Sequence, residues 1–478
     1  MKVNITANAT NTKTLFTLLK EQGIILPHSC NEKGTCGQCT VMTNRNGWQL
    51  ACSFIPSEDI VVEIPDKESQ NEANNITAKH SISAISHFTR HQKSFSGPIL
   101  LIDLGTTTIA MVLLGEDGAV SHQVTFANPN KNYGTDVIAR MKSSNEGYRH
   151  NMREQLAEEF RKQWTKFHNK SVNACYIAGN TVMIHLLMGY SCEELSVYPF
   201  TPHTLKEIQL TYQSCPVYIF PAISSFIGGD ITSGLFSLHF ENRKDTCLFL
   251  DLGTNGELAL LQRGHITVAS VAAGPAFEGG NLSCGCQGIP GAITDVKLGG
   301  LRPRLTTIGN KLPVGLCGTG ALSITAELLR KNYVTKEGII TDSFPEDGIL
   351  LGKSVTGANL LFTREDFRQV QLALASVKAG IHTLLAENNL SYHDINHIYI
   401  AGGFGYALSL ETACSLGIIN PEWKAITESV GNSSLSGLER YAMEGNENLR
   451  TLLSKTTELS LAENNYFKEE LIRCMTFC

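Results

Sequence analysis

The sequence predicts an α/β protein in which a small N-terminal domain precedes a larger part made of two similar halves. Four cysteines lie close together between residues 30 and 52, and a polar stretch rich in Asn, Ser and Lys follows at 66–97. A strand–turn–strand pattern around Asp-Leu-Gly then occurs twice, at Asp103 and at Asp251, which indicates an internal duplication. We therefore expect a domain at 1–65, a linker at 66–97, a first lobe at 98–245, and a second lobe with C-terminal helices at 246–478.

Composition excludes several classes of function. A chain of 478 residues with 42% hydrophobic residues can bury several cores. Its net charge of −6, without a basic block, argues against a nucleic-acid partner. The apolar run at 98–114 contains Asp103 and three threonines, so it divides better into strand, loop and strand than into a membrane span. Together with a start that lacks a signal-peptide pattern, this predicts a cytoplasmic protein that does not bind membranes.

The N-terminal domain is predicted from short alternating and amphipathic segments. Residues 3–7 alternate like a strand, and 12–22 have the periodicity of an amphipathic helix. A hairpin is expected through Asn44–Gly47, and VVEI at 61–64 is expected to form a late strand.

The cysteine spacing in this domain is typical of a plant-type [2Fe–2S] cluster. The expected ligands are Cys30, Cys36, Cys39 and Cys52. Such a cluster needs four converging thiolates and nearby backbone N–H groups, and glycines at 34 and 37 let the loop bend close to it. The alternative is a zinc site, but zinc ribbons usually show two Cys-x2-Cys knuckles and this domain has one. The fourteen cysteines of the chain fit metal binding in a reducing compartment better than a disulfide scaffold.

Each half of the larger part begins with a strand that ends in a Gly-containing turn rich in hydroxyl and amide side chains. We expect these turns to bind phosphate through backbone N–H groups and side chains, at Gly105, Thr106, Thr107, Thr108, Gly253, Thr254 and Asn255. Asp103 and Asp251 at the strand ends suit Mg²⁺, usually through water. Two aligned copies make the pattern much more specific than a single Asp-Leu-Gly.

A third glycine-rich turn follows a strand near the C-terminus. HIYIAGGFG at 397–405 ends in Gly402, Gly403 and Gly405, and a helix follows at LETACSLGI. A backbone without side chains permits the close approach of adenine or ribose, so we expect an ATP site. The alternative is an ordinary packing turn between strand and helix.

The order of two phosphate loops and an adenosine turn resembles the superfamily of acetate and sugar kinases, heat-shock chaperone ATPases and actin. The first 65 residues resemble the ferredoxins, with their β-grasp fold. These resemblances imply a two-lobed ATPase joined to an iron–sulfur domain. IGGDITSGLF at 227–236 is similar to the Gly-Gly-Asp segment of sugar kinases, so Asp230 is the candidate for orienting the attacking water. Glu257 is a second candidate. Either residue could instead be a helix cap or an exposed strand residue.

Further stretches match a narrower family. NPNKNYGTDVIARM at 128–141, AGNTVMIHLLMG at 178–189 and AAGPAFEGGNLSCG at 272–285 resemble the reductive activators of corrinoid proteins. This resemblance implies that ATP drives one electron from the cluster to cob(II)alamin, regenerating the cob(I)alamin that methyl transfer requires. The implied partners are a corrinoid protein of a methyltransferase system and an upstream electron donor. Whether the chain forms a homodimer is left open.

Other functions remain compatible with the same parts. The acceptor could be a 2-hydroxyacyl-CoA dehydratase, although the activators of that class use a [4Fe–4S] cluster, and the cysteines and the GPAFEGG stretch argue against it. A small-molecule kinase with a redox-sensing cluster would transfer phosphate and deliver no electron. A chaperone-like module would use ATP to set the affinity for a partner, with a structural cluster.

Overall fold

The computed structural model describes residues 2–8, 10–24, 26, 39–45, 47–64, 95–134, 136–166, 172–253, 255–300, 302–402 and 408–477. The chain divides into two compact units. The first unit comprises 1–76, 274–373 and 476–478, and the second comprises 77–273 and 374–475. Most of the expected linker, at 65–94, lies outside the described residues.

The N-terminal part of the first unit is a small antiparallel sheet with one helix beside it. Its elements are β1 (Lys2–Ile5), α1 (Leu15–Glu21), β2 (Thr40–Thr43), β3 (Gly47–Leu50) and β4 (Ile60–Glu63), with strand order β1-β4-β2-β3. The helix begins where the Thr14 side chain accepts a hydrogen bond from the Thr17 N–H. Its apolar face, including Leu15 and Leu19, is buried in the same core as Val41 of the sheet. The predicted strand, helix and hairpin are confirmed.

The second unit contains, in the part that the structure describes, two larger mixed sheets. The first has the order β7-β6-β5-β8-β10-β9 and the second β20-β19-β11-β12-β13-β21. The strands of the first are β5 (Ile99–Leu104), β6 (Thr108–Leu114), β7 (Val120–Ala127), β8 (Ala174–Gly179), β9 (Ile208–Tyr212) and β10 (Cys215–Ile219). The strands of the second are β11 (Cys247–Leu252), β12 (Gly256–Gln262), β13 (His265–Val271), β19 (His397–Ala401), β20 (Thr427–Gly431) and β21 (Thr456–Glu458).

The two sheets repeat one another strand for strand around their centres. β5 pairs antiparallel with β6 and parallel with β8, and β11 pairs in the same way with β12 and β19. In the parallel pairs, Asp103 lies opposite Ala178 and Asp251 lies opposite Ala401. The glycine that follows each alanine therefore occupies the same place in both halves. The predicted internal duplication is confirmed.

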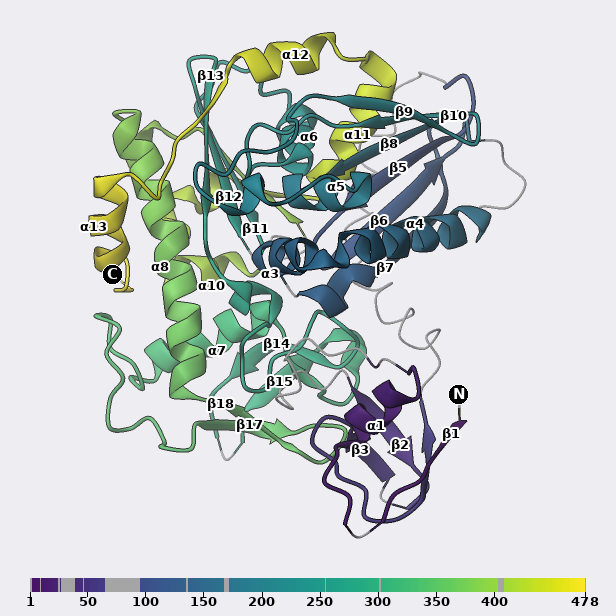
Figure 1. Ribbon diagram of the computed structural model, residues 1–478. Helices are drawn as coiled ribbons and strands as arrows, with labels where there is room; N and C mark the ends of the chain where they lie inside the picture. Colours follow the sequence, from purple (N-terminus) through teal and green to yellow (C-terminus); the bar gives the residue numbers. More distant parts are fainter. Residues whose placement is uncertain are drawn as a thin grey trace. The chain divides into compact units, whose positions relative to one another are not determined.

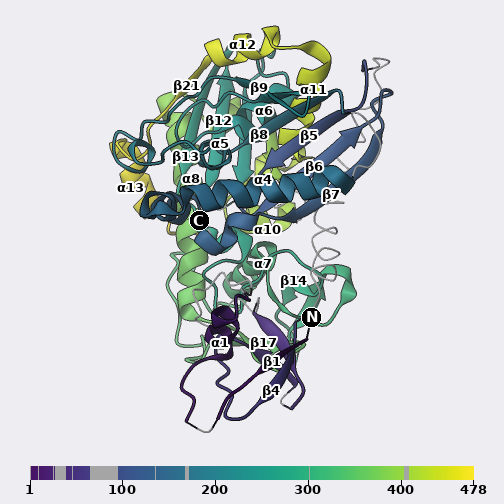
Figure 2. The same cartoon turned by 45° about the vertical axis from the view of Figure 1, so that its right-hand side comes forward.

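Helices cover the sheets of the second unit in layers (Figure 1, and turned in Figure 2). One face of the first sheet packs on α3 (Val137–Ser143), α4 (Arg149–Lys166) and α5 (Thr181–Met188). The other face shares a core with the second sheet, and α6 (Gly229–Ser237), α11 (Ser433–Glu444) and α12 (Glu447–Ser454) contribute to it. The alternation of side chains along β5 produces this division: Leu100 and Ile102 enter the first core, and Ile99 and Leu101 enter the second.

The helices α6 and α11 cross at unusually close range because small residues line their contact. A Cβ placed on Gly437 would overlap the carbonyl oxygen of Ser233, and one on Gly234 would lie 2.7 Å from Ser433 Oγ. The Ser233 hydroxyl donates to the Ser434 carbonyl oxygen at 2.7 Å across the crossing. This contact fixes the relative position of the two helix N-termini, which belong to opposite halves of the duplication.

Further helices complete the second unit. They are the later turns of α8 (Arg364–Glu387), together with α10 (Leu410–Ser415) and α13 (Asn465–Arg473). Gly380 of α8 lies against Leu258 and Val271 of the second sheet, where a side chain would not fit. The short helical turns of the second unit are η2 (Pro129–Tyr133), η3 (Ser144–Tyr148), η4 (Glu194–Ser196), η7 (Tyr392–Asp394) and η8 (Pro421–Ile426). Two further turns, η5 (Pro275–Glu278) and η6 (Ile308–Asn310), belong to the first unit.

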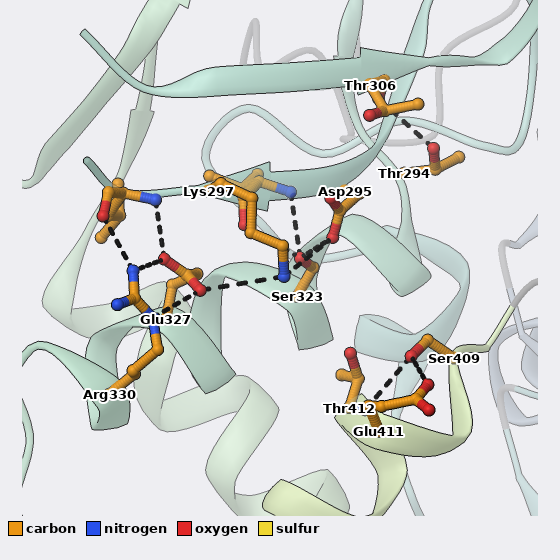
Figure 3. Close-up of polar contacts among 12 residues, drawn as sticks. Thr294, Asp295, Lys297, Thr306, Ser323, Glu327, Arg330, Ser409, Glu411 and Thr412 are labelled. Carbon is orange, nitrogen blue, oxygen red and sulfur yellow. Dashed lines mark hydrogen bonds and ion pairs between the residues drawn. The ribbon is translucent and has the colours of Figure 1, made fainter. Parts of the chain in front are cut away.

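Residues 274–373 form the remaining part of the first unit. Their elements are β14 (Ala292–Lys297), β15 (Arg304–Thr307), β16 (Gly315–Leu316), α7 (Gly318–Arg330), β17 (Ile349–Lys353) and β18 (Asn359–Phe362). Polar side chains on α7 hold the edge of β14 (Figure 3): Ser323 Oγ accepts from the Val296 N–H at 2.9 Å, and Glu327 Oε2 accepts from the Leu298 N–H at 2.7 Å. Among the helices that the structure describes, none combines the length and apolar character needed to cross a membrane.

Candidate functional site

The strand ends of the two halves bring Asp103 and Asp251 into electrostatic contact with Asp230 at the start of α6. Burial is the main reason why the pKa of Asp230 rises to about 7, and the charges of Asp103 and Asp251 raise it further. A hydrogen bond from the Ile231 N–H to Asp230 Oδ1 at 3.0 Å opposes this shift. Three carboxyl groups that repel one another in a partly buried place are chemically suited to a divalent cation.

Asp103 is held by side chains from the other half of the duplication. Its Oδ2 accepts from Asn432 Nδ2 at 2.8 Å, and its Oδ1 accepts from Ser434 Oγ at 2.9 Å. Burial raises the pKa of Asp103, and these two hydrogen bonds partly offset that effect. Asn432 also begins α11, because its Oδ1 accepts from the Leu435 N–H at 2.8 Å. The helix start and the carboxylate are therefore fixed by one side chain.

Asp251 faces a different set of neighbours. Glu257 lies directly opposite it on β12, so the two side chains share one face of the second sheet. Gly402, with φ of 78°, follows β19, and a Cβ at this position would lie 2.9 Å from Asp251 Oδ1. A side chain there would meet the carboxylate, so the turn after β19 depends on glycine. Both candidates for orienting water, Asp230 and Glu257, are thus near Asp251.

The first expected phosphate loop is a tight turn that hydrogen bonds from Asn128 hold in place. Asn128 Nδ2 donates to the Gly105 carbonyl oxygen at 2.8 Å, and its backbone N–H donates to the Thr107 carbonyl oxygen at 2.9 Å. Asn128 is fully buried. A Cβ on Gly105 would overlap the carbonyl oxygen of Thr108, where β6 begins, so glycine is required. Thr106 lies within this turn.

The second expected phosphate loop, between the paired residues Leu252 and Gly256, is one residue shorter than the first, between Leu104 and Ile109. The Gly253 N–H donates to the Asn255 carbonyl oxygen at 2.8 Å and closes the turn between β11 and β12. Thr254 lies outside the described residues, as do Gly403 and Gly405 of the third turn. The helix after that turn, α10, begins at Ser409, whose Oγ accepts from the Thr412 N–H at 3.3 Å (Figure 3).

Two of the four expected cluster ligands lie together at the end of the N-terminal sheet. Cys39 precedes β2 and Cys52 follows β3, and their Sγ atoms are 3.2 Å apart. Both cysteines are buried, and they belong to the core of this sheet. The chemistry of the pair fits two thiolates on one iron. Cys30 and Cys36 lie outside the described residues.

Sequence reasoning did not identify Asn432 and Ser434 as site residues. The internal duplication could have pointed to them. α6 follows β10, the neighbour of β8, and α11 follows β20, the neighbour of β19. Each of these helices starts beside a strand-end aspartate. Asp230 and Ser434 both occupy the second position of their helix. No short motif marks 431–434, so the correspondence becomes visible only once the two sheets are aligned.

Comparison with known proteins gives three matching family models. Residues 2–57 match the 2Fe-2S iron-sulfur cluster binding domain, residues 100–243 match the RACo middle region, and residues 245–478 match the C-terminal domain of RACo, the ASKHA domain. The matches follow one another along the chain in this order. The middle-region match nearly coincides with the first lobe predicted at 98–245.

Individual relatives agree with these models. The chain is 28% identical over 409 residues to the corrinoid activation enzyme RamQ of Eubacterium limosum, covering 77% of this chain and 68% of that protein. It is 29% identical over 253 residues to the [Co(II) methylated amine-specific corrinoid protein] reductase of Methanosarcina barkeri, covering 48% of this chain and 45% of the relative. A solved reductive activator for corrinoid, iron-sulfur protein shares the fold, with a TM-score of 0.71, 24% identity and coverage of 99% of this chain and 96% of that one.

Proposed function

We propose that this chain, which belongs to the RACo family of reductive activators of corrinoid proteins, uses ATP to drive one electron from its [2Fe–2S] cluster onto the cob(II)alamin of a corrinoid protein. The product, cob(I)alamin, is the form that accepts a methyl group in a methyltransferase system. The observation that carries the proposal is the convergence of Asp103, Asp230 and Asp251 in a chain that also places Cys39 beside Cys52.

The combination of the two sites has a thermodynamic reason. Plant-type clusters have potentials near roughly −400 mV, and the Co(II)/Co(I) couple of a bound corrinoid is expected to be lower. Each ~59 mV of mismatch in a one-electron transfer costs a factor of ten in the equilibrium. A mismatch on the order of 200 mV would leave fewer than about one cofactor in a thousand reduced. Energy from ATP is therefore needed if cob(I)alamin is to accumulate.

The nucleotide site is proposed at the strand ends of the second unit. The turns at Gly105–Thr108 and Gly253–Asn255 would hold the phosphates, and the turn beginning at Gly402 would accept the adenosine. Mg²⁺, when bound, would neutralise the phosphate charge, and Asp103 and Asp251 would hold it, usually through water. The hydrogen bonds from Asn432 and Ser434 keep Asp103 oriented for this task.

Asp230 is our first candidate for orienting the water that attacks the γ-phosphate. In the absence of Mg²⁺ its pKa is raised to about 7, so a proton is readily exchanged near neutral pH. Glu257, opposite Asp251 on β12, is the second candidate. Replacing Asp230 and Glu257 in turn by their amides would distinguish them. Loss of the residue that orients the water should lower ATP turnover without weakening ATP binding.

At the N-terminal sheet, the four thiolates of Cys30, Cys36, Cys39 and Cys52 would hold the cluster, which supplies the one-electron carrier. Cys39 and Cys52 are buried, so they would shield that side of the cluster from water. The proposed partners are a corrinoid protein as acceptor and a separate donor that re-reduces the cluster. The mass of the protein in solution would test whether the chain forms a homodimer.

The test uses anaerobic, pre-reduced protein mixed with a corrinoid protein in the cob(II)alamin state. The cobalt spectrum is followed with MgATP, with MgADP and without nucleotide. Formation of cob(I)alamin with MgATP and not with the other two supports the proposal. ATP-dependent phosphorylation of a small molecule, with an unchanged cobalt spectrum, would favour a redox-sensing kinase instead.

A further inference from the structure

A second group of metal-ligating side chains lies away from the sites described above, where α13 meets α8. His382 comes from α8, and Glu470 and Cys474 come from α13. The spacing of four residues places Glu470 and Cys474 on the same face of their helix. One ligand atom from each of the three residues lies within 4.8 Å of the other two.

The distances within this group approach those of a tetrahedral metal site. His382 Nδ1 is 2.8 Å from Glu470 Oε2, and Cys474 Sγ is 3.6 Å from His382 Nδ1 and 3.8 Å from Glu470 Oε2. Ligands bound to tetrahedral zinc lie roughly 3.2–3.7 Å from one another, given Zn–N and Zn–O bonds near 2.0–2.2 Å and a Zn–S bond near 2.3 Å. The three atoms therefore need shifts of only a few tenths of an ångström to about half an ångström to hold one ion.

The surroundings orient the histidine as they do in metal sites. Tyr392 OH is 2.7 Å from His382 Nε2, so the ring nitrogen that faces away from Glu470 and Cys474 has a fixed partner. The Trp423 indole N–H donates to the Tyr392 carbonyl oxygen at 2.8 Å and positions that residue in turn. Partners of this kind fix the tautomer and the ring orientation of a histidine ligand.

The exposure of the group suits three protein ligands and one water. The side chains of Glu470 and Cys474 are almost completely buried, and the side chain of His382 is 27% exposed. Charged neighbours are Arg473, whose Nη1 is 3.0 Å from Glu470 Oε1, and Lys378, whose charge acts on Cys474. Arg473 contacts the oxygen that faces away from the histidine. Glu470 Oε2 therefore remains directed into the group.

We propose that His382, Glu470 and Cys474 bind one Zn²⁺ ion that joins α13 to α8. The mixture of imidazole, carboxylate and thiolate ligands is the kind that zinc accepts in a tetrahedral site with a water as the fourth ligand. When Zn²⁺ binds, the Cys474 thiol releases its proton to solvent, and the neutral imidazole of His382 holds the ion through Nδ1. The proposal does not depend on the ATP or cobalt chemistry of the rest of the chain.

Such an ion would add to the apolar contacts that hold α13 on α8. The core cluster between these helices contains Ala375, Ala379 and Cys474, with Phe467, Leu471 and Met475 packed around it. The fully buried members of this cluster are small, so each of them buries little apolar surface. A metal ion that binds the folded arrangement would stabilise the attachment of α13 by mass action.

The test uses the full chain with its iron–sulfur cluster intact, so that the cluster cysteines are occupied. The protein is incubated anaerobically with ZnCl₂, desalted in the presence of a weak chelator, and analysed for zinc and iron by mass spectrometry. We expect one retained zinc per chain, with a zinc K-edge spectrum that shows one sulfur neighbour and nitrogen or oxygen neighbours. Cys474→Ser and His382→Gln should each weaken zinc binding at least about tenfold.

Cys414→Ser is the matched control, since Cys414 lies on α10 and has no part in the group. It should retain zinc as the unchanged protein does. Should Cys474→Ser fail to fold, Glu470→Gln replaces it, with the same expected loss of zinc. The proposal is overturned if the unchanged chain retains no zinc, if Cys474→Ser or Glu470→Gln retains it equally, or if the K-edge spectrum shows only sulfur neighbours.

Discussion

At the scale of single residues, the two halves of the duplication differ at the start of α6 and α11. The second helical position is Asp230 in one half and Ser434 in the other. Asp103 accepts hydrogen bonds from the neutral donors Asn432 and Ser434, and the charges of both Asp103 and Asp251 act on Asp230. Negative charge from both halves of the duplication therefore acts on Asp230. Asp230 is consequently the residue whose ionisation should respond most to Mg²⁺.

We predict that Asp230→Asn stabilises the protein at pH 8 when Mg²⁺ and nucleotide are absent. The pKa of Asp230 rises from 3.8 to about 7 on folding, so the folded state binds more protons than the unfolded state between these values. Stability of the unchanged protein therefore falls as pH rises through this window. The amide variant lacks that loss and should be more stable at pH 8 by on the order of 2 to 4 kcal/mol. Urea unfolding at pH 8 and at pH 4 measures the difference.

The exposed substitution Glu116→Gln is the control for this comparison and should shift stability by less than about 0.5 kcal/mol at both pH values. Saturating Mg²⁺ should stabilise the unchanged protein more than it stabilises the Asp230→Asn variant, because the ion compensates the negative charge of the Asp230 carboxylate. An Asp230→Asn protein that is less stable than the unchanged one at pH 8 without Mg²⁺ would contradict the charge arrangement described here.

The substitution Asn432→Asp tests the role of the hydrogen bond that Asn432 donates to Asp103. The new carboxylate still caps α11, but it cannot donate to Asp103 Oδ2 and instead repels it. We expect a loss of about 1–3 kcal/mol in the free energy of unfolding and at least about a tenfold loss of ATP turnover. Isothermal unfolding and a phosphate-release assay measure the two effects.

Asn420→Asp is the matched control, because Asn420 caps η8 through a hydrogen bond from the Glu422 N–H at 3.0 Å and an aspartate can accept it equally well. It should leave both quantities nearly unchanged. Equal effects of the two substitutions would mean that the donor to Asp103 has no special role.

At the scale of elements, the crossing of α6 and α11 determines where the carboxylates meet. Gly437→Ala would push a methyl group into the carbonyl oxygen of Ser233, a backbone atom that cannot rotate away. We predict a loss of about 3 kcal/mol or more in the free energy of unfolding, together with reduced ATP turnover, because the helix starts would move apart. Gly299→Ala is the control, since its added methyl group meets no atom within 4 Å. Thermal unfolding of both variants compares them, and equal melting temperatures would refute the close-packing argument.

Many of the helices and strands could be predicted, because the pattern that marks each half lies within a short stretch of the sequence. The strand–turn–strand repeat at Asp103 and Asp251 is visible in the sequence, since apolar runs, glycine and a terminal aspartate lie within a few residues of one another. The clamp that Asn128 places on Gly105 and the contact of Asn432 with Asp103 join distant segments. Local pattern carries no information about such pairs. For the same reason the sequence did not indicate that 274–373 belongs to a different compact unit from the strands around it.

At the scale of the whole molecule, we predict that electron delivery and ATP turnover can be lost separately. Cys52→Ser removes a proposed cluster ligand and should abolish cobalt reduction and the cluster's EPR signal, while MgATP binding stays within about twofold. Asp251→Ala should weaken MgATP-dependent turnover at least about 100-fold and leave the cluster signal intact. EPR, nucleotide binding and the cobalt spectrum are measured on the same preparations.

Cys192→Ser serves as a further control, because Cys192 is buried among helices of the second unit and belongs to neither site. It should preserve both functions as long as it folds. Loss of both functions in a folded Cys52→Ser or Asp251→Ala protein would mean that the chain does not work as two coupled parts.

The most direct test of ATP-driven electron transfer to cobalt is a titration of cobalt reduction with limiting MgATP. Pre-reduced protein and excess cob(II)alamin-loaded corrinoid protein are mixed anaerobically, and the amount of cob(I)alamin is measured after each addition of a known amount of MgATP. We predict that the amount of cob(I)alamin rises in proportion to the ATP added and stops rising when the ATP is consumed. Formation of the same amount of cob(I)alamin without nucleotide, or hydrolysis of ATP without any cob(I)alamin, would contradict it.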